Sequence, residues 1–196
     1  MKILLLCNKP PYPASEGGPM AMNSIITGLL EAGHQVKVLA VNSPKYNVKE
    51  SDIPKDYKQK TGIELIDVDL RVRPWKALIN LFTRKSYHVE RFISKDFKAR
   101  LVELLEKEQF DVVQLEMLYM APYVETIRQH SKAMIVLRAH NVEHKIWERI
   151  AKDTKFFVKR WYISYLAKTL KEYELNALET VDGIAAILAD RKSGSA

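Results

Sequence analysis

A histidine lies where a predicted strand passes into a predicted helix, in the segment LRAHNVEHKIW (137–147). There the imidazole of His140 could donate a hydrogen bond to a ligand hydroxyl or phosphate, and its pKa is easily shifted by its surroundings. Asn141 could cap the following helix or contact a substrate. The alternative is that His140 only satisfies a loop carbonyl. His144 lies one helical turn further on, but HNVEH is not the HExxH pattern and no third ligand is evident, so we expect no metal site.

Paired glycines follow the first predicted strand, in the segment NKPPYPASEGGPMAM (8–22). Gly17 and Gly18 leave no side chain between the backbone and an approaching ligand, and Pro19 suits the first turn of a helix. A helix that begins at the carboxyl end of a parallel strand favours anions such as phosphate. Glu16, directly before the glycines, is a further candidate for substrate contact. The alternative is a tight strand-to-helix turn that binds nothing.

Three more polar candidates lie at or just after the ends of the fourth and fifth strands of the predicted sheet. Glu116 ends the segment DVVQLE, Tyr119 follows it, and Arg138 lies near the end of AMIVLRA. A carboxylate at the carboxyl end of a strand could hold sugar hydroxyls. Glu116 could equally cap a helix or pair with Arg138, and these alternatives stay open at this point.

The sequence lacks the signature of a nicotinamide-binding enzyme. The first loop reads SEGGP rather than GxGxxG, and the second strand ends in Val41, Asn42 and Ser43 with no acid to hold a ribose diol. Hydride transfer is therefore not the predicted chemistry, and we expect no bound cofactor.

Strands and helices alternate along the chain, which is typical of a parallel α/β sheet. Right-handed crossovers favour a doubly wound, Rossmann-like, mostly parallel sheet of order 3-2-1-4-5-6 with helices on both faces. The expected strands cover 2–7, 35–41, 63–69, 111–116, 133–139 and 183–189. The expected helices cover 20–31, 74–82, 94–108 and 119–129, with a longer helical region over 141–180 that breaks near 153–155, and we expect 42–61 to be a loop.

A basic and aromatic segment, KFFVKRWYISYLAKTLKEYEL (155–175), is predicted to be helical. On a helix its residues give a broad apolar stripe beside a cationic face, which could lie on an anionic membrane surface. In the commoner arrangement the aromatic side chains pack on the protein's own sheet and the lysines lie in water. The aromatic residues are not on paired strands, so the segment does not resemble an RNA-binding platform, and we expect no nucleic-acid partner.

The composition is that of an ordinary globular protein, with 196 residues, 47% hydrophobic, a formal net charge of +7 and a pI of about 9.3. The length predicts one domain, or one and a small part of another. Cys7 is the only cysteine, which excludes an intrachain disulfide and indicates a reducing compartment; we expect it to be buried rather than reactive. Without a signal peptide or a membrane-spanning segment, we expect a cytoplasmic protein that could touch the inner face of the membrane.

Three segments together resemble the N-terminal half of a retaining GT-B glycosyltransferase of the large GT4 group. Residues 1–41 give a strand, a prolyl loop with paired glycines, a helix and then GHxVxV. RAHNVEHKIWERI (138–150) resembles the histidine-bearing segment of that group. RWYISYLAKTLKEYELNALETVDGIAAI (160–187) resembles the long helix before the last strand of its first domain. The likeness covers nearly the whole chain.

The resemblance implies two Rossmann-like domains that face each other across a cleft. The second domain holds most of the nucleotide-sugar donor, and the first provides the acceptor site and a glycine loop near the donor phosphates. Gly17 and Gly18 would take that loop role, and His140 would contact the donor sugar close to the reaction centre. The implied reaction is transfer of a hexosyl group, with retention and without a bound metal, to an unknown sugar or lipid-linked acceptor in cell-surface polysaccharide or glycolipid synthesis.

The donor-binding second domain of that family, with its paired glutamates, has no counterpart in the sequence. We therefore expect 1–190 to form the N-terminal domain, 191–196 to be a short tail or cloning remnant, and the natural polypeptide to continue. Such an isolated domain should be inactive alone, because half of the transition-state contacts are missing. Two alternatives remain: a fragment of another GT-B enzyme such as a nucleotide-sugar epimerase, and a non-enzymatic basic module that docks on membranes or on a partner protein.

Overall fold

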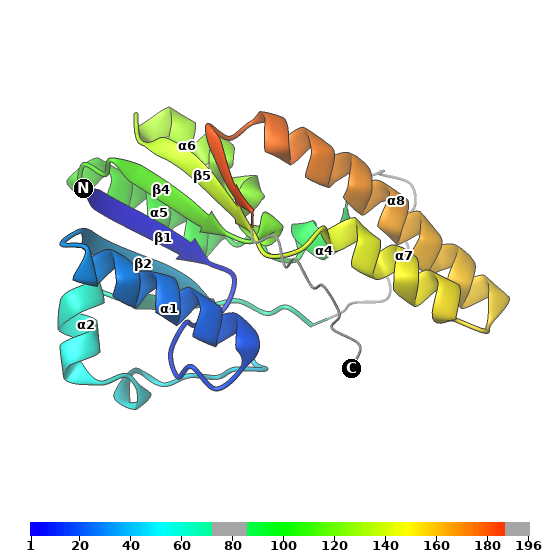
Figure 1. Ribbon diagram of the computed structural model, residues 1–196, viewed down its shortest axis with the longest axis horizontal. Coiled ribbons are helices and arrows are strands. Elements are labelled where there is room, and N and C mark those ends of the chain that lie inside the picture. The colour runs from blue at the N-terminus through cyan, green and yellow to red at the C-terminus, as the bar shows by residue number, and fades with distance from the viewer. Residues whose placement is uncertain (72–85, 187–196) are drawn as a thin grey trace, which may run out of the picture.

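Across the residues that the structure describes, 1–71 and 86–186, the chain forms a six-stranded parallel sheet between two layers of helices (Figure 1). The structure is a computed structural model. Its strands follow the order β3-β2-β1-β4-β5-β6, which confirms the Rossmann-like order predicted from the sequence. The strands are β1 Lys2–Cys7, β2 Gln35–Asn42, β3 Glu64–Asp67, β4 Val112–Glu116, β5 Met134–Ala139 and β6 Gly183–Ala186.

Helices cover both faces of the central strands. Because successive side chains of a strand point to opposite faces, Ile3 and Leu5 of β1 pack with α1 while Leu4 packs with Phe97 of α5. A strand that is buried on both sides reads as a continuous apolar run, which is why β1 was evident in the sequence. The α-helices within the described residues are α1 Gly17–Glu31, α2 Lys55–Thr61, α4 Tyr87–Glu90, α5 Lys95–Lys107, α6 Val124–His130, α7 Glu143–Asp153 and α8 Phe157–Glu179.

The segment 42–61 is not the loop that the sequence predicted. It contains a short 3-10 turn, η1 (Glu50–Asp52), and the helix α2. The helix is polar, but Tyr57 packs beside the apolar cluster between the sheet and α1. Gly62, with φ of 51°, ends it in the left-handed conformation that glycine adopts without a steric penalty.

Two other expectations about the elements need adjustment. The first helix begins at Gly17 rather than Met20, so both paired glycines belong to the helix. The helix expected over 119–129 starts as a 3-10 turn, η2 (Leu118–Tyr123), and becomes α-helical only in α6, after Pro122. The helix expected over 74–82 and the end of the sixth strand, 187–189, lie outside the described residues.

The long helical region breaks as expected, between α7 and α8. The two helices pack side by side as an antiparallel hairpin that extends away from the carboxyl edge of the sheet (Figure 1). Among the described residues, no helix combines the length and the apolar character needed to cross a bilayer.

Candidate functional site

Three of the predicted site residues meet at the carboxyl ends of β4 and β5. Glu116 and Arg138 lie opposite each other in the register of these strands, and the carboxylate accepts a hydrogen bond from the guanidinium at 2.7 Å. The same oxygen, Oε2 of Glu116, lies 3.1 Å from Nε2 of His140. The other oxygen accepts a hydrogen bond from Gln114 at 2.6 Å. Both oxygens of the carboxylate are thus engaged by protein groups.

The charged pair of this cluster is buried, and the imidazole lies at its partly exposed side. The side chains of Glu116 and Arg138 are 0% and 7% exposed, whereas that of His140 is 13% exposed. Nε2 of His140 lies 3.0 Å from Nη1 of Arg138 and 3.1 Å from Oε2 of Glu116, so this nitrogen meets a group that only donates hydrogen bonds and a group that only accepts them. Nδ1 has no hydrogen-bond partner among the described residues, so it is the ring nitrogen that can meet a ligand.

The backbone is strained at one residue of the turn that follows β4. Met117, directly after Glu116, has φ of 75° and ψ of 158°, a backbone conformation that residues other than glycine rarely adopt. Its N–H donates to the carbonyl oxygen of Arg138 at 3.1 Å. Strained residues of this kind cluster at functional sites, where the surrounding structure holds them in place.

Arg138 also connects this cluster to the helix that begins with the paired glycines. Its Nη2 donates to the carbonyl oxygen of Ala21 in α1 at 3.4 Å. The start of α1 and the cluster of Glu116, Arg138 and His140 therefore lie at the same edge of the sheet. The order of the strands reverses between β1 and β4, and ligands of doubly wound sheets bind in the crevice at such a switch point.

The N-terminus of α1 has no side-chain cap among the described residues. Glu16 is its N-cap residue, but the Glu16 carboxylate lies near Tyr46 (3.3 Å) and Lys45 (3.5 Å) instead. A Cβ added at Gly17 would meet no atom within 4 Å, whereas one added at Gly18 would lie 2.9 Å from Nζ of Lys9. Gly18 therefore leaves space for the ammonium group of Lys9 beside the start of the helix.

Asn141 does not cap the next helix, contrary to the prediction. It is exposed, and the N-cap residue of α7 is Val142. The first backbone N–H groups of α7 instead donate to the carboxylate of Glu174 on α8, at 3.0 Å from Glu143 and 3.1 Å from His144. The same carboxylate contacts Nδ1 of His144 at 2.7 Å. A carboxylate at a helix N-terminus is favourable because it meets both the unpaired N–H groups and the positive end of the helix dipole.

Tyr119 contributes to this neighbouring cluster rather than to the one around Glu116. Its hydroxyl donates to Oε2 of Glu143 at 2.8 Å. Burial raises the pKa of Glu143, and the nearby charge of Glu174 adds to the effect; the hydrogen bond from Tyr119 and the charges of His140 and Lys9 oppose it. Tyr119, Glu143 and Glu174 therefore form one cluster at the start of α7.

Sequence reasoning missed Lys9, Glu143 and Glu174. Glu174 had a detectable signal, because it lies in phase with the buried residues Leu170 and Ala177 on an otherwise apolar helix face. A carboxylate at such a position needs a buried partner. Lys9 lies two residues after the end of β1, at the carboxyl edge of the sheet, where doubly wound sheets bind their ligands.

Cys7 is fully buried, and burial raises the pKa of its thiol well above its ordinary value, which agrees with a structural role. Among residues 1–71 and 86–186, no group of three or more histidine, cysteine or acidic side chains is arranged to hold a metal ion.

Comparison with known proteins identifies no relative: no protein-family model matches the chain, and no curated protein is significantly similar to it in sequence. What the structure defines is therefore the class of fold, a Rossmann-like α/β domain with a polar cluster at its switch point.

Proposed function

We propose that this chain is the acceptor-side domain of a GT-B glycosyltransferase, which moves a sugar from a nucleoside-diphosphate sugar to an acceptor. The observation that carries the proposal is the contact of Arg138 and His140 with one oxygen of Glu116, beside the helix that begins with Gly17. The resemblance of the three sequence segments supports it, because His140 and the glycines are the residues to which that resemblance assigns roles.

In the proposed reaction, the bond between the anomeric carbon of the sugar and a phosphate oxygen of the donor breaks, the acceptor oxygen forms a bond to that carbon, and the proton of the acceptor hydroxyl passes to the leaving nucleoside diphosphate. Negative charge develops on the leaving phosphate. The N–H groups of Gly17 and Gly18 and the ammonium group of Lys9 would stabilise that charge, since fixed dipoles and cations act strongly in a site shielded from water. Nδ1 of His140 would contact a hydroxyl of the donor sugar.

The acceptor in this proposal carries a phosphate or carboxylate group. A cavity of about 320 Å³ opens at the carboxyl ends of β1, β2 and β3, next to the start of α1. Its lining includes four cationic and no acidic side chains among the described residues; the cations are Lys9, Lys45, Arg71 and Arg91. Two of them meet carboxylates outside the lining, Lys45 at 3.5 Å from Glu16 and Arg71 at 2.8 Å from Asp69. Asn8 also lines it and is 7% exposed, and its Oδ1 has no partner among these residues, so it could accept a hydrogen bond from an acceptor hydroxyl.

The proposal is tested in the complete gene product, supplied with a panel of nucleoside-diphosphate sugars. Replacement His140→Ala should lower turnover about 100-fold, the size of effect that follows removal of one transition-state hydrogen bond. His130→Ala is the matched control, because His130 ends α6 at the opposite edge of the sheet. Equal turnover of both variants would contradict the role of His140, and epimerisation of the nucleotide sugar without transfer would favour the epimerase alternative.

A further inference from the structure

The turn between α7 and α8 exposes a group of large apolar side chains. Phe156, Phe157 and Trp161 are 63%, 71% and 62% exposed, and Val158 is also exposed. Further along α8 most apolar residues are buried or half-buried, as at Leu170, and Leu175 is the exposed exception at 50%. The helix therefore packs on the protein along most of its length and leaves its first turns uncovered by any described residue.

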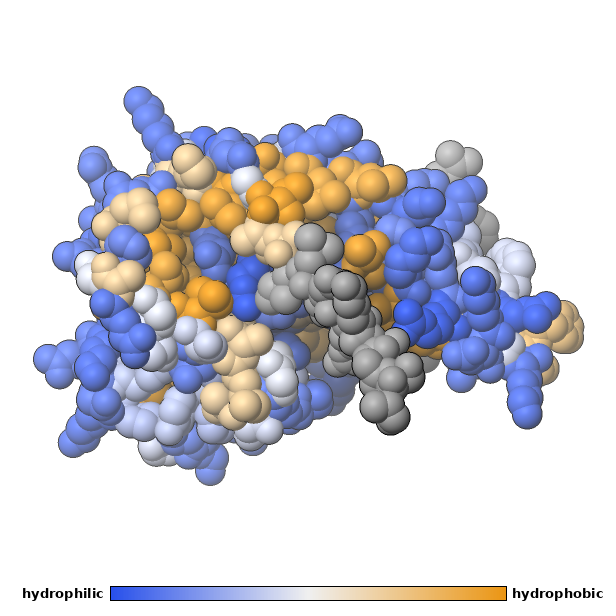
Figure 2. Space-filling model, in the orientation of Figure 1, coloured by the Kyte–Doolittle hydropathy of each residue, from blue (hydrophilic) through white to orange (hydrophobic). Residues whose placement is uncertain are grey.

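Cationic side chains surround these apolar ones. The segment 149–160 contains five cationic residues and one carboxylate: Arg149, Lys152, Lys155, Lys159, Arg160 and Asp153. In Figure 2 the end of the hairpin, at the right of the view, shows a small apolar area among hydrophilic side chains. We call this group, residues 149–161, the hairpin tip.

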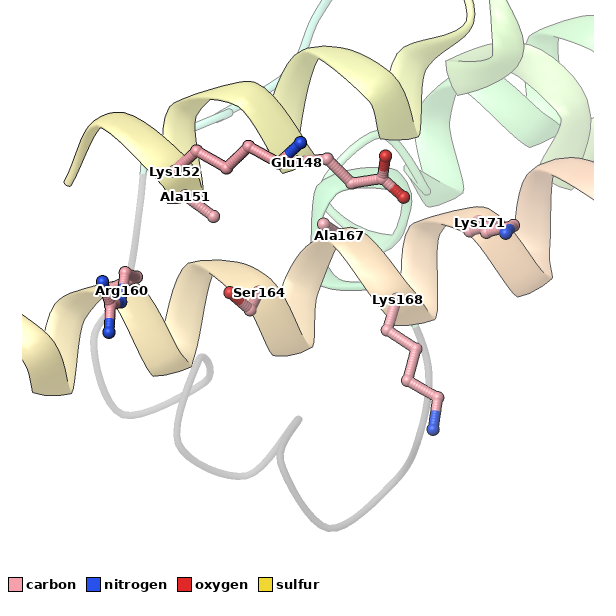
Figure 3. A pocket seen from close by; sticks show the side chains of 8 residues that line it. All are labelled: Glu148, Ala151, Lys152, Arg160, Ser164, Ala167, Lys168 and Lys171. Atoms are coloured by element: carbon pink, nitrogen blue, oxygen red, sulfur yellow. The ribbon is translucent and has the colours of Figure 1, made fainter.

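A hollow between the two helices extends this cationic surface. It has a volume of about 590 Å³, and Lys152 of α7 and Arg160, Lys168 and Lys171 of α8 contribute to its lining, with Glu148 as the acidic residue (Figure 3). Figure 3 shows that the cations come from both helices, with Lys152 on α7 and the others on α8, and that the side chain of Lys168 extends away from α7. The hollow is therefore suited to anionic groups, and it adjoins the exposed aromatic residues in sequence.

We propose that the hairpin tip docks on an anionic phospholipid bilayer. Aromatic rings that project from the end of a hairpin can enter the boundary between headgroups and acyl chains without a shape-matched partner. Lysine and arginine side chains behind them reach the headgroup phosphates, and each cation near such a surface adds to the attraction. Charge complementarity thus selects an anionic bilayer as the partner, and this inference does not depend on the proposed transferase activity.

The test is flotation of this chain with vesicles made of equal parts of phosphatidylglycerol and phosphatidylcholine. We expect binding that falls at least about tenfold when phosphatidylglycerol is omitted, or when salt rises from roughly 0.1 M to roughly 1 M. Fluorescence emission from Trp161 should shift to shorter wavelength on binding, and this component should disappear in Trp161→Phe.

Two pairs of variants distinguish vesicle binding through the hairpin tip from vesicle binding through the rest of the surface. F156S/F157S should weaken vesicle binding about tenfold or more, whereas Met134→Ser should not, because Met134 is an exposed apolar residue at the amino edge of the sheet. K155E/K159E should also weaken it, whereas a reversal of equal charge elsewhere, K55E/K132E, should change it less than twofold. The altered side chains are exposed, and circular dichroism checks that each variant is folded.

Three results would overturn the inference. One is the absence of binding to anionic vesicles. Another is equal loss of binding in the tip variants and their controls, which would mean that the net charge of +7 acts without a defined surface. The third is sedimentation that reveals a dimer abolished by F156S/F157S without any vesicle binding, which would assign the tip to contact between two copies of the chain.

Discussion

Glu116 and Arg138 form a buried ion pair across β4 and β5, with 2.7 Å between Oε2 and Nη1. A charge removed from water is stable only if a partner and hydrogen bonds compensate for its lost hydration. Here the carboxylate also meets His140 and Gln114, so one buried acid positions three side chains. The pair is therefore the structural support of the candidate site.

Loss of this carboxylate should strongly destabilise the fold. Glu116→Ala leaves the guanidinium of Arg138 buried without its partner, and we expect the free energy of unfolding to fall by about 3–5 kcal/mol. The double variant E116L/R138M should recover much of that loss, since apolar residues can replace a buried ion pair at little cost. Urea denaturation measures both. A loss below about 1 kcal/mol in Glu116→Ala would mean that Arg138 finds solvent or another acceptor.

The carboxylate of Glu174 should determine whether the start of α7 is ordered. Glu174→Ala removes the acceptor of two backbone N–H groups, those of Glu143 and His144, and should cost about 2 kcal/mol. Hydrogen exchange of these two amides should accelerate, while Glu172→Ala, an exposed change on the same helix, should leave it unaltered. Unchanged exchange in Glu174→Ala would show that another group caps the helix.

The contrast between β1 and Glu174 explains how much the sequence could predict. An apolar run such as Lys2–Cys7 identifies a buried strand by itself, and the chirality of crossovers then limits the strand order, so the sheet was predictable. The cap of α7 depends on two residues thirty-one positions apart, Glu143 and Glu174, and no local pattern encodes that distance. For the same reason the pairing of Glu116 with Arg138 could only be offered among alternatives.

The helix α2 was missed for a different physical reason. Its sequence KDYKQKT is polar, and only Tyr57 and Thr61 are directed toward the protein, so no apolar period of 3.6 residues is visible. Its order comes from tertiary contacts of Tyr57 and from the left-handed turn at Gly62, which local sequence patterns describe poorly.

His88 should make the protein less stable in mildly acidic solution. It is buried and packs against Trp147 with 3.8 Å between ring centroids and the rings tilted by 31°, and Nε2 has no hydrogen-bond partner among the described residues. Burial, with the nearby charge of Arg91 as a smaller cause, lowers the pKa of His88 from 6.5 to about 4. Between pH 6.5 and pH 4, the folded protein therefore keeps this imidazole neutral, whereas the same imidazole in the unfolded chain binds a proton.

The sign of the effect follows from that difference in pKa. The contribution of neutral His88 to the free energy of unfolding is fully present above pH 6.5. As the pH falls toward 4, the free energy of unfolding decreases by about 3 kcal/mol in total. His88→Phe keeps an aromatic ring against Trp147 but cannot titrate. Unfolding free energies of both proteins between pH 7 and pH 4 should therefore diverge in favour of the variant as the solution becomes acidic. Parallel curves would mean that His88 is hydrated and titrates normally.

Alanine at Gly17 should change the stability of the fold, whereas alanine at Gly18 should change the position of the Lys9 side chain. Neither Gly17 nor Gly18 has a positive φ, and both lie in the first turn of α1, so alanine fits the backbone. A Cβ at Gly17 meets no atom within 4 Å, and Gly17→Ala should raise the free energy of unfolding by about 0.5–1 kcal/mol because alanine restricts the unfolded chain. The melting temperature should rise by roughly 2 °C.

A Cβ at Gly18 would instead displace the end of the Lys9 side chain, whose Nζ lies 2.9 Å from its position. Because a lysine side chain is flexible, Gly18→Ala should fold normally but move the ammonium group away from the start of α1. Calorimetry of both variants tests the first effect, and the chemical shift of the Lys9 ammonium group tests the second. A lower melting temperature for Gly17→Ala, or an unmoved Lys9 resonance in Gly18→Ala, would contradict the arrangement of the glycine turn described above.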